Sequence, residues 1–160
     1  MKVAVAYDHR GRGRAGCVKA TIEQQGHDFV DLGPAGEGTV DFPDFAHAAA
    51  TKVAENDVDT AILLGATGME MDMSANKLKG IRAARCNDEL DAHTARLHFD
   101  ANVLCLPGEL VNETVLRRIV EVWLETGFEK RERAERRIRK IEALEQGADP
   151  GQVPHTGDGR

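Results

Sequence analysis

Residues 61–77 read AILLGATGMEMDMSANK and contain the strongest indication of the fold. The first four, Ala61–Leu64, form an uninterrupted apolar run that is short for a buried helix. A run of this kind is typical of a strand that is covered on both faces, as strands of parallel sheets are. The small residues Gly65–Gly68 follow directly and indicate a tight turn. Residues 65–77 as a whole are interpreted as a loop.

The same kind of apolar run recurs along the chain, separated by longer amphipathic stretches. Further strands are predicted at Val3–Ala6, Phe29–Leu32, Ile81–Ala84 and Val103–Leu106. Helical spacing of apolar residues predicts helices at Ala15–Gln25, Asp44–Glu55 (with Asp44 as N-cap), Asp88–Asp100 and Val111–Leu124. Strands that alternate with helices predict an α/β fold, a Rossmann-like open parallel five-stranded sheet with helices on both faces.

Residues 130–140 (KRERAERRIRK) are rich in basic side chains and are predicted to form a C-terminal basic helix. A narrow apolar seam runs through this helix, at Ala134, Ile138, Ile141 and Leu144. Such a seam packs against the same domain or against a neighbouring subunit. We therefore assign residues 1–146 to a single domain and the Gly- and Pro-rich residues 147–160 to a disordered tail.

The composition limits the kinds of partner. The chain has 160 residues, a net charge of −6 and only 4% aromatic residues, which argues against a nucleic-acid-binding protein. Its three cysteines form no CxxC pair, so we expect reduced thiols, a cytoplasmic location and no metal site. No stretch approaches the roughly 20 apolar residues of a membrane span, so no membrane partner is expected.

The turn after the first predicted strand carries the first candidate site. Asp8 and His9 lie at the carboxyl end of that strand, where open α/β sheets bind ligands. Arginines follow within residues 10–14, and guanidinium groups beside a helix N-terminus suit a phosphate. A solvated turn is the alternative. Gly11, Gly13 and Gly16 also fit the pattern G-x-G-x-x-G, which leaves a dinucleotide-binding module as a further alternative.

Two acidic residues and a histidine are candidates for proton transfer. Glu70 and Asp72 lie in the 65–77 loop, where a partly buried carboxylate can act as a general base. Burial beside the neighbouring methionines is expected to raise the pKa of Glu70. His98, near the end of the predicted helix 88–100, can act as a general acid. An ordinary acidic loop and a surface histidine are the alternatives.

Four stretches together resemble the family of ribose-5-phosphate isomerase type B and the galactose-6-phosphate isomerase subunits. They are Asp8-His9-x-Gly11, Asp41-Phe42-Pro43, Thr67-Gly68 with Ala75-Asn76-Lys77-x-x-Gly80-Ile81-Arg82-Ala83, and His98-x-Asp100-x-Asn102-Val103. The resemblance covers residues 1–146 in order. It implies the same open sheet and the interconversion of aldose and ketose phosphates through a cis-enediolate, without metal or organic cofactor.

The resemblance also implies roles for single residues. Asp8 and His9 would contact the sugar and its phosphate, and His98 would assist ring opening. The site would lie between two subunits, with arginines of the final helix holding the phosphate. Arg133 and Arg137 keep the family's spacing of four if one residue is inserted before them.

A gapless alignment of the final helix instead offers Arg136 and places Glu132 at the other arginine position.

The chain departs from the family pattern at the position of the base. Many members place the proton-transferring cysteine where this chain has Gly65, and others use a glutamate at the position of Met71. Glu70 stands where the family normally has a glycine of the anion hole, and Phe99 replaces an asparagine that contacts the sugar. Glu70 is the favoured base, because it is one residue from that glutamate position and has the longer reach, and Asp72 is the second candidate.

These arguments lead to one prediction and two alternatives. We predict an aldose–ketose isomerase that acts on a ribose 5-phosphate-like sugar through an enediolate, with an atypical base, no cofactor and a homodimeric or homotetrameric assembly. The alternatives are a non-catalytic or partner subunit of such an isomerase, and a phosphate- or dinucleotide-binding module. The predicted catalytic residues are Thr67, Glu70, Asp72 and His98, and the predicted substrate-binding residues are Asp8, His9, Gly68, Asn76, Phe99, Arg133 and Arg137.

Overall fold

The computed structural model describes residues 1–154. From residue 2 to residue 125 strands and helices alternate, as the apolar runs predict, and two further helical segments follow. The strands are β1 (Lys2–Tyr7), β2 (Asp28–Asp31), β3 (Thr60–Gly65), β4 (Ala83–Arg85) and β5 (Val103–Pro107). The helices are α1 (Arg12–Gln24), α2 (Phe42–Ala54), α3 (Met69–Ala75), α4 (Glu89–Phe99), α5 (Glu113–Glu125), α6 (Glu132–Glu145) and the short 3-10 helix η1 (Pro150–Gln152).

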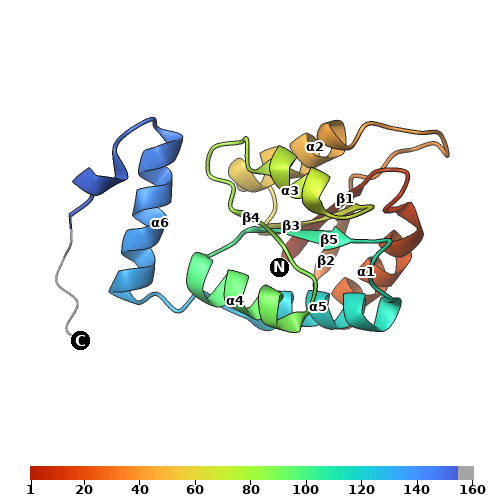
Figure 1. Ribbon diagram of the computed structural model, residues 1–160. Helices are drawn as coiled ribbons and strands as arrows, with labels where there is room; N and C mark the ends of the chain where they lie inside the picture. The colour runs from red at the N-terminus through yellow and green to blue at the C-terminus, as the bar shows by residue number, and fades with distance from the viewer. Residues whose placement is uncertain (155–160) are drawn as a thin grey trace.

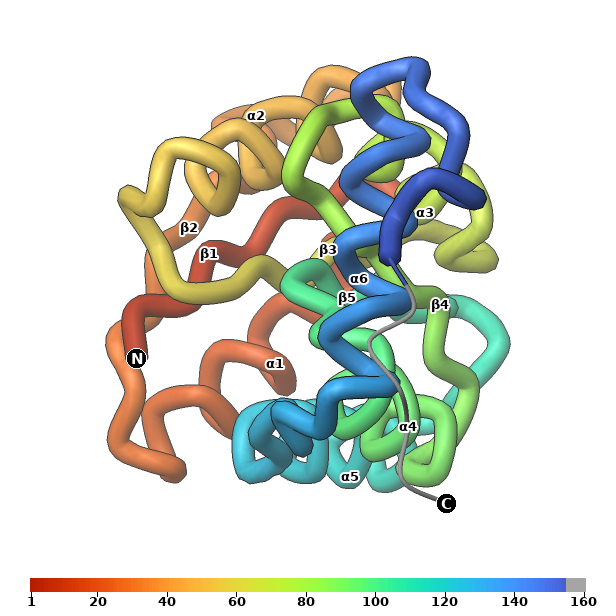
Figure 2. Tube along the Cα trace, turned by 90° about the vertical axis from the view of Figure 1, so that its left-hand side faces the viewer, coloured from red at the N-terminus to blue at the C-terminus, as the bar shows by residue number. Residues whose placement is uncertain are grey.

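The strands form one parallel sheet in the order β2-β1-β3-β5-β4. Figure 1 shows α2 and α3 on one face of this sheet and α1, α4 and α5 on the other. Helix α6 stands beyond the amino ends of the strands, and Figure 2 views the molecule from that end. The predicted α/β fold, an open five-stranded parallel sheet with helices on both faces, is confirmed.

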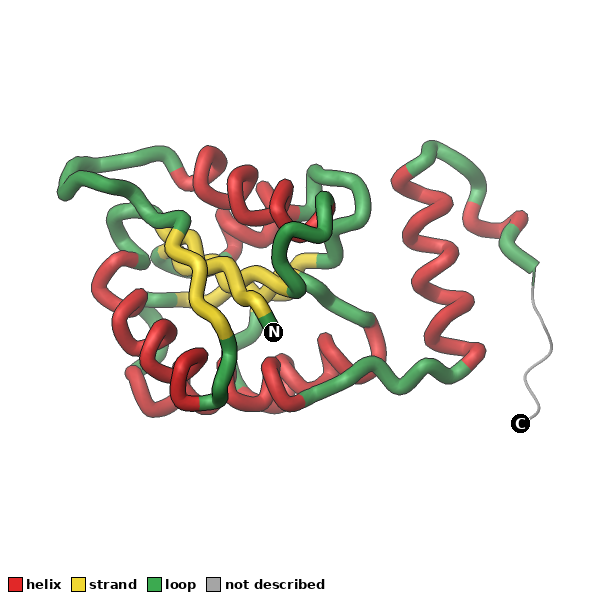
Figure 3. The backbone as a smooth tube through the Cα atoms, turned by 180° about the vertical axis from the view of Figure 1, so that it is seen from behind, coloured by secondary structure: helices red, strands yellow, loops and turns green. Residues whose placement is uncertain are grey.

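The strands send successive side chains to opposite helical layers. In β1, Val3 and Val5 face the layer of α1, α4 and α5, whereas Ala4 and Ala6 face α2 and α3. All four are fully buried, so the strand is apolar at every position instead of alternating with polar residues. Figure 3 shows the strands enclosed between the two helical layers. The central strand β3 follows the same alternation, so its last residue, Gly65, faces the layer of α2 and α3.

Helix α3 corrects one prediction, because the segment 65–77 is not entirely a loop. Residues Met69–Ala75 form a helix of two turns. Its apolar residues Met71 and Ala75 are fully buried against the sheet. A single pair of buried residues, four apart, is too short a pattern to be recognised as helical periodicity.

Helix α2 corrects a second prediction, because Asp44 is not its N-cap. The helix begins at Phe42, with Asp41 at the N-cap position. Pro43 lies in the first turn, where the missing N–H of proline costs no hydrogen bond. Asp44 is instead an acidic residue of that turn, where it complements the helix dipole.

The apolar seam predicted for the C-terminal helix is divided in α6. Ala134 and Ile138 are buried, whereas Ile141 and Leu144 are 38% and 60% exposed. Of the predicted tail, residues 147–154 are described and include η1, and residues 155–160 lie outside the described residues. Within residues 1–154, no helix is long and apolar enough to cross a membrane.

Candidate active site

The order of the strands marks one point at the carboxyl edge of the sheet. After β1 the chain moves outward to β2 on one side, and after β3 it moves to the other side. Ligands of open α/β sheets bind where neighbouring connections diverge in this way. Asp8 and His9 follow β1 here, and the turn Ala66-Thr67-Gly68 follows Gly65, the last residue of β3. Four predicted site residues, Asp8, His9, Thr67 and Gly68, therefore lie at adjacent strand ends.

Asp8 is buried, and its carboxylate binds backbone N–H groups of the turn in which it lies. Oδ1 accepts the N–H groups of Arg10 and Gly11, each at 2.9 Å. Gly11 is required because a Cβ at this position would lie 2.2 Å from the carbonyl oxygen of Leu64. This close contact places the turn, and with it Asp8, beside the end of β3. His9 is exposed beside it, with its Nδ1 near the backbone of the loop after β2.

The arginines of the first turn bind neighbouring loops. Arg10 donates to both carboxylate oxygens of Glu109, at 2.9 and 2.7 Å. Arg14 donates to the carbonyl oxygen of Gly108 at 3.0 Å, and Arg12 donates to the backbone of the loop after β2. These contacts join the loops at the carboxyl edge of the sheet. The guanidinium groups that the sequence suggests for phosphate are therefore already engaged by the protein.

The glycine spacing of the same turn does not build a dinucleotide site. Gly13 and Gly16 lie inside α1, and a Cβ at either position would meet open space. In a dinucleotide-binding turn, close approach to the pyrophosphate or to the neighbouring strand requires these glycines. Of the three glycines, Gly11 alone is in a close approach, and its neighbour is the backbone of β3.

Glu70 reaches back from the first turn of α3 to the end of β3. Its Oε2 accepts a hydrogen bond from the Thr67 hydroxyl at 2.5 Å. Its Oε1 accepts the N–H groups of Thr67 and Gly68, at 3.1 and 3.4 Å. Gly68 has φ of 77°, a left-handed conformation that turns the chain into α3. The carboxylate favoured as a base therefore lies at the strand end where a ligand is expected.

The surroundings of Glu70 favour its ionised form. Burial raises its pKa, but hydrogen bonds from the Thr67 side chain and the backbone of the turn lower it by more, so the pKa lies below its ordinary value. The expected rise is therefore wrong. Met69 is 52% exposed and Met71 is buried in the core, so neither forms an apolar cover strong enough to reverse this balance. An ionised carboxylate is the form that accepts a proton.

Asp72 and the two buried cysteines have raised pKa values, in contrast to Glu70. Burial raises the pKa of Asp72, which also contacts Asn76. Burial raises the thiol pKa of Cys86 to about 12 and that of Cys105 well above its ordinary value. Neither buried thiol is ionised near neutral pH, so Glu70 remains the favoured base and Asp72 the second candidate.

Asn76 lies at the opposite end of α3 from Glu70 and binds the backbone of β4. Its Oδ1 accepts the N–H of Ala83 at 2.9 Å, and its side-chain nitrogen donates to the carbonyl oxygen of Ala83 at 3.1 Å. These two bonds attach the edge strand β4 to α3. The role of Asn76 in substrate binding stays a prediction.

His98 pairs with a residue that the sequence analysis missed. Its Nδ1 lies 2.8 Å from Oε1 of Glu129. The hydrogen bond with His98 lowers the pKa of Glu129, and Arg131 lies 3.1 Å from the other carboxylate oxygen. Because Nδ1 is engaged, Nε2 is the ring nitrogen left for proton transfer. The two residues are 31 positions apart, and no sequence spacing indicated the pair.

The remaining predicted residues lie at the other end of the sheet. His98 and Phe99 end α4 just before β5 begins, and Arg133 and Arg137 lie on α6 (Figure 1). Strand β5 has 5 residues, and the steps between them, at about 3.3 Å each, separate its ends by roughly 13 Å. A pentose phosphate is shorter than this. Within one chain, these four residues are therefore not brought together with Glu70.

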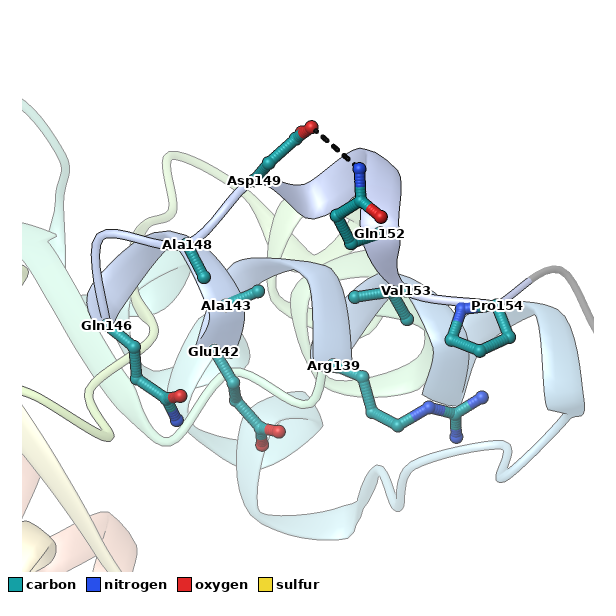
Figure 4. A pocket seen from close by; sticks show the side chains of 9 residues that line it. All are labelled: Arg139, Glu142, Ala143, Gln146, Ala148, Asp149, Gln152, Val153 and Pro154. Carbon is teal, nitrogen blue, oxygen red and sulfur yellow. Dashed lines mark hydrogen bonds between the residues drawn. The ribbon is translucent and has the colours of Figure 1, made fainter.

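A separate cavity of about 400 Å³ lies between α6 and η1 (Figure 4). Two of its charged lining residues, Arg139 and Asp149, are engaged locally. Arg139 pairs with Glu132 at 2.9 Å, and Asp149 accepts hydrogen bonds from Gly151 and Gln152. This cavity shares no residue with the strand-end site. In the part of the chain that the structure describes, no cluster of three or more His, Cys, Asp or Glu side chains could hold a metal ion.

Comparison with known proteins agrees with this geometry. The family model described as Ribose/Galactose Isomerase matches residues 3–141. The putative sugar phosphate isomerase YwlF of Bacillus subtilis is 38% identical over 147 residues, which cover 91% of this chain and 98% of the relative. The type B ribose 5-phosphate isomerase of Trypanosoma brucei superposes with a TM-score of 0.88 at 37% identity, covering 89% of this chain and 97% of the other.

A second solved structure is ribose-5-phosphate isomerase B of Mycoplasma genitalium with bound ribulose-5-phosphate. It superposes with a TM-score of 0.86 at 38% identity, covering 91% of this chain and 96% of the other. The family match, over residues 3–141, includes both strand ends that carry the candidate site. On the family match, the identities and the shared fold, this chain belongs to the ribose/galactose isomerase family.

Proposed function

We propose that this chain is a sugar-phosphate isomerase that interconverts a ribose 5-phosphate-like aldose and its ketose through an enediolate, with Glu70 as the base. The observation that carries the proposal is the Glu70 carboxylate, ionised and held by Thr67 and Gly68 at the divergence of β1 and β3. The substrate class is supported by relatives named as ribose-5-phosphate isomerases, one of which holds ribulose-5-phosphate.

The proposed reaction needs one group that takes a proton from carbon and returns it. Glu70 removes the proton from C2 of the open-chain aldose phosphate, the C–H electron pair forms the C1–C2 double bond, and the aldehyde oxygen becomes an oxyanion. The protonated carboxyl then returns its proton to C1, while the proton of the C2 hydroxyl passes to the oxygen on C1. Atoms and electrons balance without a co-reactant, and the product is the ketose phosphate.

The groups that bind Glu70 have a second use in this reaction. A neutral carboxyl is a weaker hydrogen-bond acceptor than a carboxylate. Once Glu70 carries the proton, the N–H groups of Thr67 and Gly68 are released toward the oxyanion that forms at the same moment. Asp8, buried at the adjacent strand end, and the exposed His9 would bind the sugar and its phosphate.

We further propose that a second copy of the chain completes each site, in a homodimer or homotetramer. His98, Phe99, Arg133 and Arg137 lie at the amino end of the sheet, too far away for one pentose phosphate to reach both groups within one chain. A two-fold arrangement would bring these residues to the partner's Glu70. Residues 1–146 would act as one domain, and the reduced thiols fit a cytoplasmic location.

Exchange of the C2 proton in deuterated water tests the proposed reaction. Across a panel of four- to six-carbon sugar phosphates, the wild type is expected to exchange the C2 proton of at least one member. Glu70→Gln keeps the size of the side chain and is expected to slow exchange by about 100-fold or more. Asp72→Asn tests the second candidate base, and Glu55→Gln, an exposed position at the end of α2, is the control.

The competing function is a non-catalytic partner subunit. It is favoured by the fact that Glu70 already binds the N–H groups that an oxyanion would need. If the wild type exchanges no proton with any member of the panel, this function replaces the isomerase. If Glu70→Gln exchanges at the wild-type rate, another residue is the base.

A further inference from the structure

The last residue of β3, Gly65, faces the layer that contains α3. Along β3, Ile62 and Leu64 face α1 and α5, whereas Ala61 and Leu63 face α2 and α3. Because side chains alternate along a strand, a side chain at position 65 would point to the α3 side. Helix α3 carries the Glu70 side chain back over the same strand end.

The space in front of Gly65 is filled by the carboxylate of Glu70. A Cβ built on Gly65 would lie 2.1 Å from Oε1 of Glu70 and 2.9 Å from its Cδ, and the three nearest atoms all belong to this side chain. The conformation of Gly65 does not require glycine, because its φ is not in the left-handed region. What requires glycine here is therefore the position of the carboxylate.

We propose that Gly65 is a positioning residue for Glu70: by lacking a side chain, it lets the carboxylate enter from α3 and occupy the place where a side chain of residue 65 would begin. The two positions then act as a pair, in which either residue 65 carries a side chain at this point or Glu70 lies there. The catalytic part of this inference rests on the proposed function, whereas the structural part does not.

The pair has a direct chemical consequence. The carboxylate at this point keeps its three hydrogen bonds to the turn Thr67-Gly68, and it stands directly at the strand end. A methyl group on residue 65 would displace the end of the flexible Glu70 side chain, and these hydrogen bonds would be lost. The loss would move the base away from the substrate carbon and at the same time raise its pKa toward the ordinary value.

The titration of Glu70 tests the structural part of the inference without any substrate. In Gly65→Ala, the pKa of the Glu70 carboxyl, followed by carbon-13 NMR, is expected to rise toward its ordinary value because the hydrogen bonds that lower it are lost. The control is Gly16→Ala, on the open surface of α1, which is expected to leave the titration unchanged. An unchanged Glu70 titration in Gly65→Ala would overturn the inference.

Two further variants show whether a loss of stability in Gly65→Ala comes from contact with Glu70. Removing the carboxylate first, in Glu70→Ala, vacates the space. The double variant Gly65→Ala/Glu70→Ala is then expected to unfold within about 1 °C of Glu70→Ala alone, whereas Gly65→Ala alone is expected to lower Tm by about 3–10 °C if Glu70 cannot move away. A loss of Tm of about 3 °C or more in both backgrounds would show that other atoms close the space, which contradicts the inference.

The exchange assay separates this inference from the proposed function. Gly65→Ala is expected to slow C2 proton exchange by at least about tenfold, because the base is displaced. If Glu70→Gln abolishes exchange and Gly65→Ala leaves it at the wild-type rate, the positioning role of Gly65 is wrong and the isomerase stands. If Glu70→Gln leaves exchange intact while the Glu70 titration responds to Gly65→Ala, the isomerase mechanism fails and the pairing of the two residues stands.

Discussion

At the scale of residues, hydrogen bonding and burial shift the pKa values of Glu70 and of the buried thiols in opposite directions. Glu70 accepts three hydrogen bonds and has a lowered pKa, whereas Cys86 and Cys105 are buried in apolar surroundings and have raised pKa values. The carboxylate is therefore charged and the buried thiols are neutral at the same pH. The hydrogen bonds from the turn Thr67-Gly68 keep the Glu70 carboxylate ionised and fix its position at the strand end.

Thiol reagents are expected to leave the isomerisation unaffected. Cys86 has a pKa of about 12 and Cys105 is fully buried, so neither provides the thiolate that iodoacetamide attacks. Cys17 is half-buried on α1 and is the most accessible of the three thiols. The measurement is C2 proton exchange before and after alkylation, with Cys17→Ser as the control. Loss of exchange in alkylated Cys17→Ser would mean that a buried cysteine takes part.

The pair His98–Glu129 is expected to make stability depend on pH in the acidic range. The folded pKa of Glu129 lies below its ordinary value of 4.5, so its contribution is fully present above that value and is lost as pH falls through the folded pKa. His98→Ala removes the main cause of the lowered pKa and is expected to reduce this loss. Urea unfolding midpoints between about pH 6 and pH 3 measure it.

The matched control for this pair is Arg131→Ala, which removes the weaker neighbour of Glu129. It is expected to alter the acid dependence less than His98→Ala does. An identical acid dependence in wild type and His98→Ala would contradict the assigned pair.

At the scale of elements, the short edge strand β4 is held by side chains as well as by its neighbour β5. Asn76, at the end of α3, binds the N–H and the carbonyl of Ala83. Asn102, just before β5, accepts the N–H of Arg82 at 2.8 Å and donates to the carbonyl of Gly80 at 2.8 Å. A strand of three residues makes few ladder bonds, so these side chains set where it begins.

Asn76→Ala is expected to loosen β4 and to destabilise the protein by about 1–3 kcal/mol, because two backbone groups of Ala83 lose their partner. Denaturant midpoints measure the free energy of unfolding, and hydrogen exchange of the Ala83 amide is expected to quicken by about tenfold. Lys77→Ala, at the exposed neighbouring position, is the control. If Asn76→Ala weakens substrate binding and changes neither measurement, Asn76 is a ligand of the sugar and not an anchor of β4.

At the scale of the whole molecule, the length of the sheet separates the two halves of the predicted site. Glu70 lies at the carboxyl edge, and Arg137 lies on α6 beyond the amino edge (Figures 1 and 3). Helix α6 also leaves Ile141 and Leu144 of its seam partly exposed. An assembly in which copies meet through α6 would cover this surface and unite the two halves.

Mixing two inactive variants tests this arrangement. Glu70→Gln and Arg137→Ala, each expected to be weakly active alone, are expected to recover about a quarter of wild-type exchange after subunits are mixed in equal amounts. Half of the random dimers are then mixed, and each mixed dimer contains one intact site in two. No recovery, with mixed dimers demonstrated by mass spectrometry, would contradict a site shared between copies.

The sequence alone determined the class of fold and the part of the candidate site that lies at the carboxyl edge of the sheet. Apolar runs such as Ala61–Leu64 and the amphipathic stretches between them are local patterns, so strands and helices could be predicted in order. The strand ends at Asp8 and Gly65 then followed, because all strands of a parallel sheet point the same way. Helix α3 escaped prediction because its buried pattern consists only of Met71 and Ala75.

Only the tertiary structure decided the surroundings of the candidate groups. Hydrogen bonds from the turn lower the pKa of Glu70, and burial raises it. Which effect is larger depends on the tertiary structure and cannot be read from the sequence. The pairing of His98 with Glu129 joins positions 31 apart. The contact of Glu70 with Gly65 depends on the face that the end of β3 presents to α3, because a side chain's neighbours are set by packing between elements and not by their order along the chain.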